Sequence, residues 1–150
     1  MTIELTSADV PQEDDLGTVR LVVEAIGQGL QDTQGLAEKS GVSRRHVGYA
    51  INAAFVLGWV VEEPDRLAIS PEGQKLLAQP SGSPAEKPLL RAAIEQSAAV
   101  QAIAKDLLAA EGPTRKVLSE RIRDATGLSA STSERRAQTL LSWRRQVLGG

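Results

Sequence analysis

Residues 36–51, which read LAEKSGVSRRHVGYAI, constrain the fold of this chain most strongly. Two stretches with helical spacing of apolar residues lie on either side of a short turn. Gly41 tolerates the positive φ of such a turn, Ser43 is a preferred helix N-cap, and Ala37 is small enough for a second helix to cross the first. The segment therefore predicts two short helices that cross at about 90–120°. The apolar residues that would fill the angle between them are Leu36, Val42, Val47 and Ala50.

The residues around this segment extend the prediction. Apolar residues at helical spacing follow Asp15 and end near Gly27. After Gly58, the runs WVVEE and LAIS have strand character and flank the turn PDR, and Ser70 with Pro71 predicts the start of another helix. Over residues 15–78 the order helix, helix, turn, helix, hairpin, helix resembles the winged helix-turn-helix DNA-binding proteins of bacteria. This resemblance implies that the helix after the turn binds double-stranded DNA.

The rest of the chain divides into three parts. Residues 1–14 are predicted to be a flexible acidic N-terminus, and residues 79–88, QPSGSPAEKP, a linker rich in Pro, Ser and Gly. Residues 89–150 are predicted to form a second helix-turn-helix-like helical domain, with a long Ala-rich helix over 89–110 and a basic helix over 132–148. We therefore expect a mostly α fold with a small β hairpin and tandem helix-turn-helix units that behave as separate units.

Candidate DNA-binding residues lie on both predicted recognition helices. A helix N-terminus favours phosphate, and Arg and Asn side chains match the edges of guanine and adenine. In the first unit the candidates are Ser43, Arg44, Arg45, His46, Tyr49 and Asn52, with Arg66 in the hairpin. In the second unit they are Arg115, Lys116, Thr132, Arg135, Arg136, Gln138, Thr139 and Ser142. The segment STSERRAQTLLSWRRQVL is similar to terminal helix-turn-helix segments of some bacterial restriction and phage-defence proteins.

The charge distribution separates the two halves. Residues 1–80 carry 6 Lys/Arg and 12 Asp/Glu, whereas residues 81–150 carry 11 and 7. Phosphate neutralisation supplies most non-specific DNA affinity, so we expect the C-terminal helix to dominate binding. Glu62, Glu63 and Asp65 make the predicted hairpin acidic, which argues against minor-groove contact by this hairpin.

Two functions fit this pattern. One is a non-catalytic double-stranded DNA-binding protein, acting as a transcriptional regulator or as the DNA-recognition subunit of a defence or restriction assembly. The alternative is a protein–protein adaptor, because tandem winged-helix proteins of chromosome-organising complexes resemble this layout. A seam of small residues on the predicted helix 89–110 would suit a homodimer or a larger protein complex, or equally burial against the other two helices of its own unit.

Other chemistry is poorly supported. The chain has no Cys and one His, which excludes disulfides and argues against a His-rich metal site. The glycines of EAIGQG lack the strand–loop–helix context of a phosphate loop. We therefore expect no enzyme activity, no cofactor and no metal. The N-terminus lacks the features of a signal peptide, and no apolar run is as long as a membrane span, so we expect a cytoplasmic protein without a membrane partner.

Overall fold

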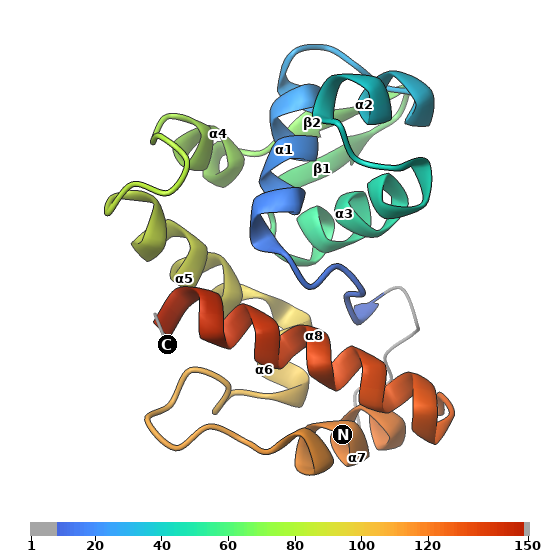
Figure 1. Ribbon diagram of the computed structural model, residues 1–150, viewed down its shortest axis with the longest axis vertical. Helices are drawn as coiled ribbons and strands as arrows, with labels where there is room; N and C mark the ends of the chain where they lie inside the picture. The colour runs from blue at the N-terminus through green and yellow to red at the C-terminus, as the bar shows by residue number, and fades with distance from the viewer. Residues whose placement is uncertain (1–8, 149–150) are drawn as a thin grey trace.

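The computed structural model describes residues 9–148, which form helices and one antiparallel hairpin (Figure 1). In chain order the elements are α1 (Leu16–Gly27), α2 (Thr33–Ser40), α3 (Arg44–Val56), β1 (Val60–Glu63), β2 (Arg66–Ile69), α4 (Pro71–Leu77), α5 (Glu86–Gln96), α6 (Ala98–Ile103), α7 (Arg115–Thr126) and α8 (Ala130–Leu148). The prediction of a mostly helical chain with a small hairpin is confirmed.

The first half has the element order predicted for a winged helix. Helices α1, α2 and α3 contact one another, and β2 packs against α1. The two strands pair antiparallel from Val60 with Ile69 to Glu63 with Arg66. Ser70 then caps α4, and its hydroxyl also donates to the carbonyl of Gly58 at 2.5 Å. One serine therefore fixes the start of α4 to the chain that leaves α3.

The turns before α3 and α8 have the same structure. Each contains a left-handed glycine, with φ of 75° in the first turn and 74° in the second. The hydroxyl before each glycine donates to the carbonyl four residues earlier at 2.6 Å. The serine two positions after each glycine accepts from the N–H three residues later. The matching residues are Ser40, Gly41, Val42 and Ser43 in the first turn, and Thr126, Gly127, Leu128 and Ser129 in the second.

The prediction of one long helix over 89–110 is wrong. Helix α5 ends at Gln96, α6 covers only Ala98–Ile103, and irregular chain follows. The break occurs at Ser97, whose extended backbone and hydroxyl cap α6, because a serine that bonds locally competes with helix continuation. The seam expected to bind a partner is buried within this chain instead. Its residues are Ala93, Ser97, Val100, Ala104 and Leu107.

Arg144 of α8 forms hydrogen bonds with the irregular segment after α6. Its Nη1 donates to the carbonyls of Leu107 and Ala109, both at 2.6 Å, and its Nη2 donates to Ala110 at 3.3 Å. A Cβ at Gly112 would lie 2.5 Å from this guanidinium. Carbonyls outside regular secondary structure need donors, and Arg144 supplies them. These bonds explain why an arginine of α8 points toward the apolar side of the helix.

Both halves share one cluster of buried side chains. Trp59 and Leu76 of the first half and Leu90 and Ile94 of the second belong to the same cluster. The linker predicted over 79–88 is too long, because residues 86–88 already form the first turn of α5. A shared core also disagrees with two separate units, since removing one half would expose apolar side chains of the other.

The prediction of a flexible acidic N-terminus over 1–14 is wrong for residues 9–14. Val10 is 0% exposed, and Pro11 and Glu13 are buried as well. The remaining part of that prediction, residues 1–8, lies outside the described residues. The N-terminal segment 9–14 runs between the first half and α8 (Figure 1). It therefore contributes to the packing that joins the two halves.

Candidate nucleic-acid interface

Buried contacts fix the orientation of α3. Val47 and Ala50 are 0% exposed and face the core, as the helical pattern predicts. At the start of the helix, the Ser43 hydroxyl accepts from the His46 N–H at 3.4 Å. The buried side and the cap together hold the opposite side of α3 toward solvent.

The solvent side of α3 begins in its first turn. Arg44, Arg45, His46 and Gly48 are exposed, and Tyr49 and Asn52 are half-buried. A Cβ at Gly48 would meet no heavy atom within 4 Å, so the surface beside Arg44 is open. Within residues 9–148, Arg44 forms no ion pair, whereas Asn52 has an interaction partner. The first turn of α3 therefore presents two guanidinium groups on an unobstructed surface.

Tyr49 orients Arg45 along the helix. The Nε of Arg45 donates to the Tyr49 hydroxyl at 3.1 Å, and the guanidinium carbon lies 5.7 Å from the ring centroid. This hydrogen bond raises the pKa of Arg45, so the side chain stays a cation. Because the bond uses Nε, the two terminal nitrogens of Arg45 still point outward for a ligand. A planar guanidinium in this position suits phosphate or the edge of guanine.

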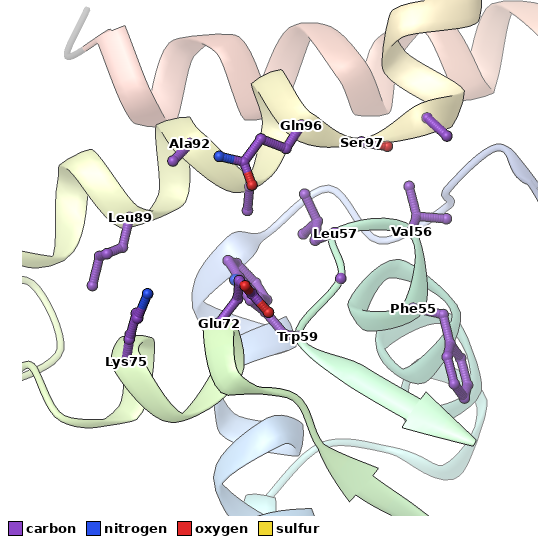
Figure 2. Close-up of a pocket in the computed structure, with 13 residues that line it drawn as sticks. Phe55, Val56, Leu57, Trp59, Glu72, Lys75, Leu89, Ala92, Gln96 and Ser97 are labelled. Carbon is purple, nitrogen blue, oxygen red and sulfur yellow. The ribbon is translucent and has the colours of Figure 1, made fainter. Parts of the chain in front are cut away.

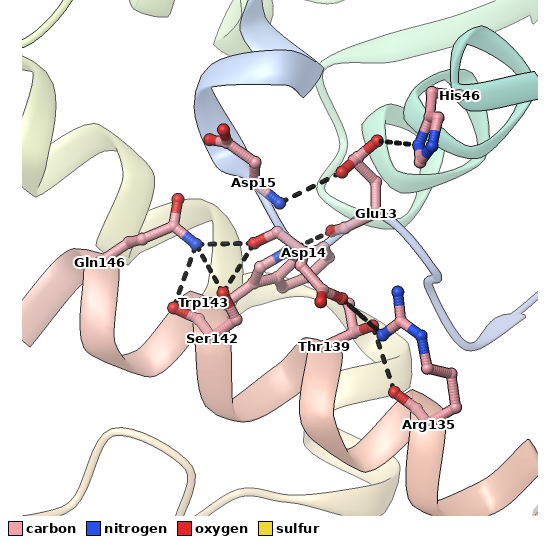
Figure 3. Close-up of polar contacts among 9 residues, drawn as sticks. All are labelled: Glu13, Asp14, Asp15, His46, Arg135, Thr139, Ser142, Trp143 and Gln146. Carbon is pink, nitrogen blue, oxygen red and sulfur yellow. Dashed lines mark hydrogen bonds and ion pairs between the residues drawn. The ribbon is translucent and has the colours of Figure 1, made fainter. Parts of the chain in front are cut away.

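His46 contacts the N-terminal segment, although its side chain is 55% exposed. Its Nδ1 lies 3.2 Å from Oε1 of Glu13, whose side chain is only 8% exposed (Figure 3). The His46 ring also meets Tyr49 edge-on, with centroids 5.7 Å apart. These contacts link α3 to residues 9–14 and leave His46, which is predicted to bind DNA, at the surface of the first turn of α3.

The hairpin adds little positive charge. Arg66, the basic candidate of this turn, lies 3.6 Å from the Glu63 carboxylate. Glu62, Glu63 and Asp65 are exposed around it. The hairpin is therefore a surface of net negative charge around Arg66.

The predicted reading face of α8 is occupied by the N-terminal segment (Figure 3). The backbone carbonyl of Asp14 accepts from Ser142 at 2.9 Å and from Gln146 at 2.6 Å. The carbonyl of Glu13 accepts from the Trp143 ring nitrogen at 2.8 Å. Because residues 13 and 14 lie outside regular secondary structure, their carbonyls need side-chain donors. The polar side of α8, predicted to face DNA, therefore binds protein backbone through Ser142 and Gln146 in this structure.

The arginines of α8 have different environments. Arg136 is 5% exposed and donates to the carbonyl of Val10 at 2.8 Å, and burial lowers its pKa. Thr139 is 0% exposed and donates to the Asp14 carboxylate at 2.5 Å. Arg135 has a half-exposed side chain and pairs with the same carboxylate at 2.8 Å. Burial therefore removes Arg136 and Thr139 from any external contact, whereas Arg135 remains at the surface.

The other candidates lie apart from α3. Thr132 and Gln138 are half-buried on α8, and Arg115 and Lys116 are exposed in the first turn of α7. The α7 pair lines a hollow of about 550 Å³ between α7 and the start of α8, together with Arg123, Glu120 and Glu134. The mixed charge of this hollow makes it a weaker anion site than the first turn of α3.

A second hollow of about 460 Å³ marks the junction of the two halves (Figure 2). Its walls come from the end of α3, from α4 and from α5, with Leu57 and Leu89 on opposite sides and Lys75 at the rim. Trp59 lies at its floor and is 1% exposed. This hollow is on a different part of the molecule from the solvent side of α3.

Comparisons with protein-family models, curated proteins and solved structures found no match. The assignment of a site therefore depends on the geometry of this chain. In residues 9–148 no three His, Asp or Glu side chains are placed to hold a metal ion. No helix of that part is long and apolar enough to cross a membrane.

The roles of Glu13, Asp14, Trp143 and Gln146 were not predicted from the sequence. The sequence gives only a weak signal for these roles, because donors such as Gln and Ser suit a nucleic acid and a protein backbone equally well. The apolar pair Val10-Pro11 within an acidic stretch is the one local sign that residues 9–14 pack against the core.

Proposed function

We propose that this protein binds double-stranded DNA through the solvent side of α3 and does so without catalysis. The observation that carries the proposal is the pair of exposed guanidinium groups of Arg44 and Arg45 at the N-terminus of a helix held rigidly by its buried side. Backbone N–H groups and the helix dipole at that end favour an anion. A phosphate there satisfies both arginines and the helix terminus.

The side chains of α3 suggest a division of roles. Arg44, beside the open surface at Gly48, would contact phosphate. Arg45, oriented by Tyr49, and Asn52 lie further along the helix, where base edges of the major groove would be reached. The acidic hairpin would stay outside the minor groove, so contact would be confined to the helix. Such a module would serve a transcriptional regulator or the DNA-recognition subunit of a defence or restriction assembly.

A protein–protein adaptor is the second candidate function. The observation in its favour is the hairpin, where Val61 is 45% exposed beside the exposed Glu62 and Glu63. An exposed apolar side chain within an acidic strand suits a basic, partly apolar protein surface. In that case the loss of charge from α3 would leave the main activity of the protein unchanged.

The test is fluorescence anisotropy of a labelled random-sequence duplex across a salt series. On a random-sequence duplex no base is preferred, so both arginines should contact phosphate. Arg44→Ala with Arg45→Ala should then lower the salt slope by about 1.8, since each phosphate contact contributes about 0.9. Affinity at moderate salt should fall about tenfold or more, because the counterion release of two phosphate contacts is lost.

The matched control removes two positive charges elsewhere, by Lys87→Ala with Arg91→Ala on the exposed side of α5. This control should weaken binding by less than about twofold, because it changes only the long-range electrostatic potential at α3. No duplex binding by the wild-type chain at low salt would refute the proposal and favour the adaptor. Equal losses from both double variants would show that binding follows net charge and not α3.

A further inference from the structure

Two consecutive residues of the N-terminal segment connect the proposed DNA surface to α8. Glu13 contacts His46 in the first turn of α3, and Asp14 pairs with Arg135 in the N-terminal half of α8 (Figure 3). Consecutive Cα atoms are about 3.8 Å apart, so the two contacts are close in space. In Figure 1, α3 and α8 also begin on the same, right-hand side of the molecule.

Arg135 can readily exchange its ion pair with Asp14 for a contact with another anion. The two side chains are 54% and 37% exposed, so solvent and salt screen their attraction. Asp14 keeps the hydrogen bond from Thr139 at 2.5 Å if Arg135 turns away. When Arg135 is released, the Asp14 carboxylate therefore still has a hydrogen-bond donor. The guanidinium of Arg135 then becomes available at the surface.

We propose that Arg135 binds a backbone phosphate of the same duplex that α3 contacts, and that the Asp14 carboxylate competes with this phosphate for it. The inference rests on the proposed DNA-binding function and deepens it. Helix α8 contributes one cation to the interface, while its polar side stays bound to residues 9–14. Asp14 weakens DNA binding in two ways, because it neutralises Arg135 and repels phosphate.

The experiment uses the full chain and the duplex assay described above, with Asp14→Asn, Arg135→Ala, Arg135→Lys and the double variant Asp14→Asn/Arg135→Ala. Asparagine keeps an oxygen that accepts from Thr139, so the segment should remain docked. We expect Asp14→Asn to tighten binding about two- to fivefold, which matches the small free energy of a surface ion pair. Arg135→Ala should lower the salt slope by about 0.9, and Arg135→Lys should restore it.

The double variant separates the two parts of the inference. It should show the reduced salt slope of Arg135→Ala, because the phosphate contact is absent whether or not Asp14 is charged. Unchanged affinity and slope for Arg135→Ala, together with a loss for the Arg44/Arg45 variant, would overturn the inference and leave the proposed function intact. Weaker binding by Asp14→Asn, with unchanged urea unfolding, would overturn the competition. Absence of duplex binding by the wild-type chain would overturn both proposals.

Discussion

The ion pair between α1 and α5 offers the sharpest test of how the two halves are joined. Arg20 and Glu86 have side chains only 5% and 11% exposed, and Nη1 of Arg20 lies 2.5 Å from Oε2 of Glu86. Arg20 also donates to the carbonyl of Gln79 at 2.5 Å and pairs with Glu24 at 3.0 Å. Replacement of Glu86 by Gln removes one charge from this network with little change in shape.

The expected loss follows from the donors around Glu86. One carboxylate oxygen accepts from Arg20 and the other from the Gly82 N–H at 3.1 Å. A carboxamide has only one oxygen, so in either orientation its NH₂ group faces a donor. Loss of one partner of a buried pair costs about 3–5 kcal/mol, but Glu24 and the Gln79 carbonyl still stabilise Arg20. We therefore expect Glu86→Gln to lower the free energy of unfolding by about 3 kcal/mol.

The assay is urea unfolding followed by circular dichroism and by tryptophan fluorescence. Trp59 reports on the first half and Trp143 on the second, so single-tryptophan variants with Phe at the other position follow each half. The control is Glu95→Gln, which breaks the exposed pair of Arg91 and Glu95 and should cost less than about 0.5 kcal/mol. A loss below about 1 kcal/mol for Glu86→Gln, or a fluorescence midpoint that differs from the circular dichroism midpoint of the same single-tryptophan variant, would refute the shared-core argument.

Two further predictions concern single sites. Gly73→Ala should lower the free energy of unfolding in urea by about 1–3 kcal/mol, because the added Cβ would lie 2.3 Å from the Trp59 carbonyl oxygen. An unchanged free energy would show that α4 can shift without cost. A hydrogen bond from Arg121 lowers the pKa of Asp106 below 3.8 in the folded chain, so its stabilisation is present above that pH and is lost as pH falls through the folded pKa. Asp106→Asn should therefore cost at most about 1 kcal/mol at pH 7, and the difference from wild type should shrink as the pH is lowered below 3.8.

Local signals predicted the first half well. Gly41 and Ser43 form the expected turn and cap, and Ser70 with Pro71 begins α4 as predicted. These residues succeed because backbone sterics and a cap hydrogen bond act within a few positions of the chain. The apolar positions Val47 and Ala50 are also buried as the helical period requires.

Long-range contacts account for the failures. The helical period correctly divides α8 into two sides, but it does not say which partner the polar side binds. Here that partner is backbone at Glu13 and Asp14, more than a hundred positions away. The Ala-rich neighbours of Ser97 predict a helix that continues through it, whereas in the structure its hydroxyl caps α6. The same ambiguity affects Arg135, whose charge suits a carboxylate and a phosphate alike.

The docking of residues 9–14 on α8 sets the order in which this fold is completed during synthesis. The contact between Glu13 and Trp143 spans 130 positions, so residues 9–14 are synthesised well before the helix on which they dock. Until α8 is made, the carbonyls of residues 13 and 14 lack their donors. Contacts of such separation form slowly, because closure of a long loop has a large entropic cost. Residues 9–14 therefore take their final position only after α8 has been synthesised.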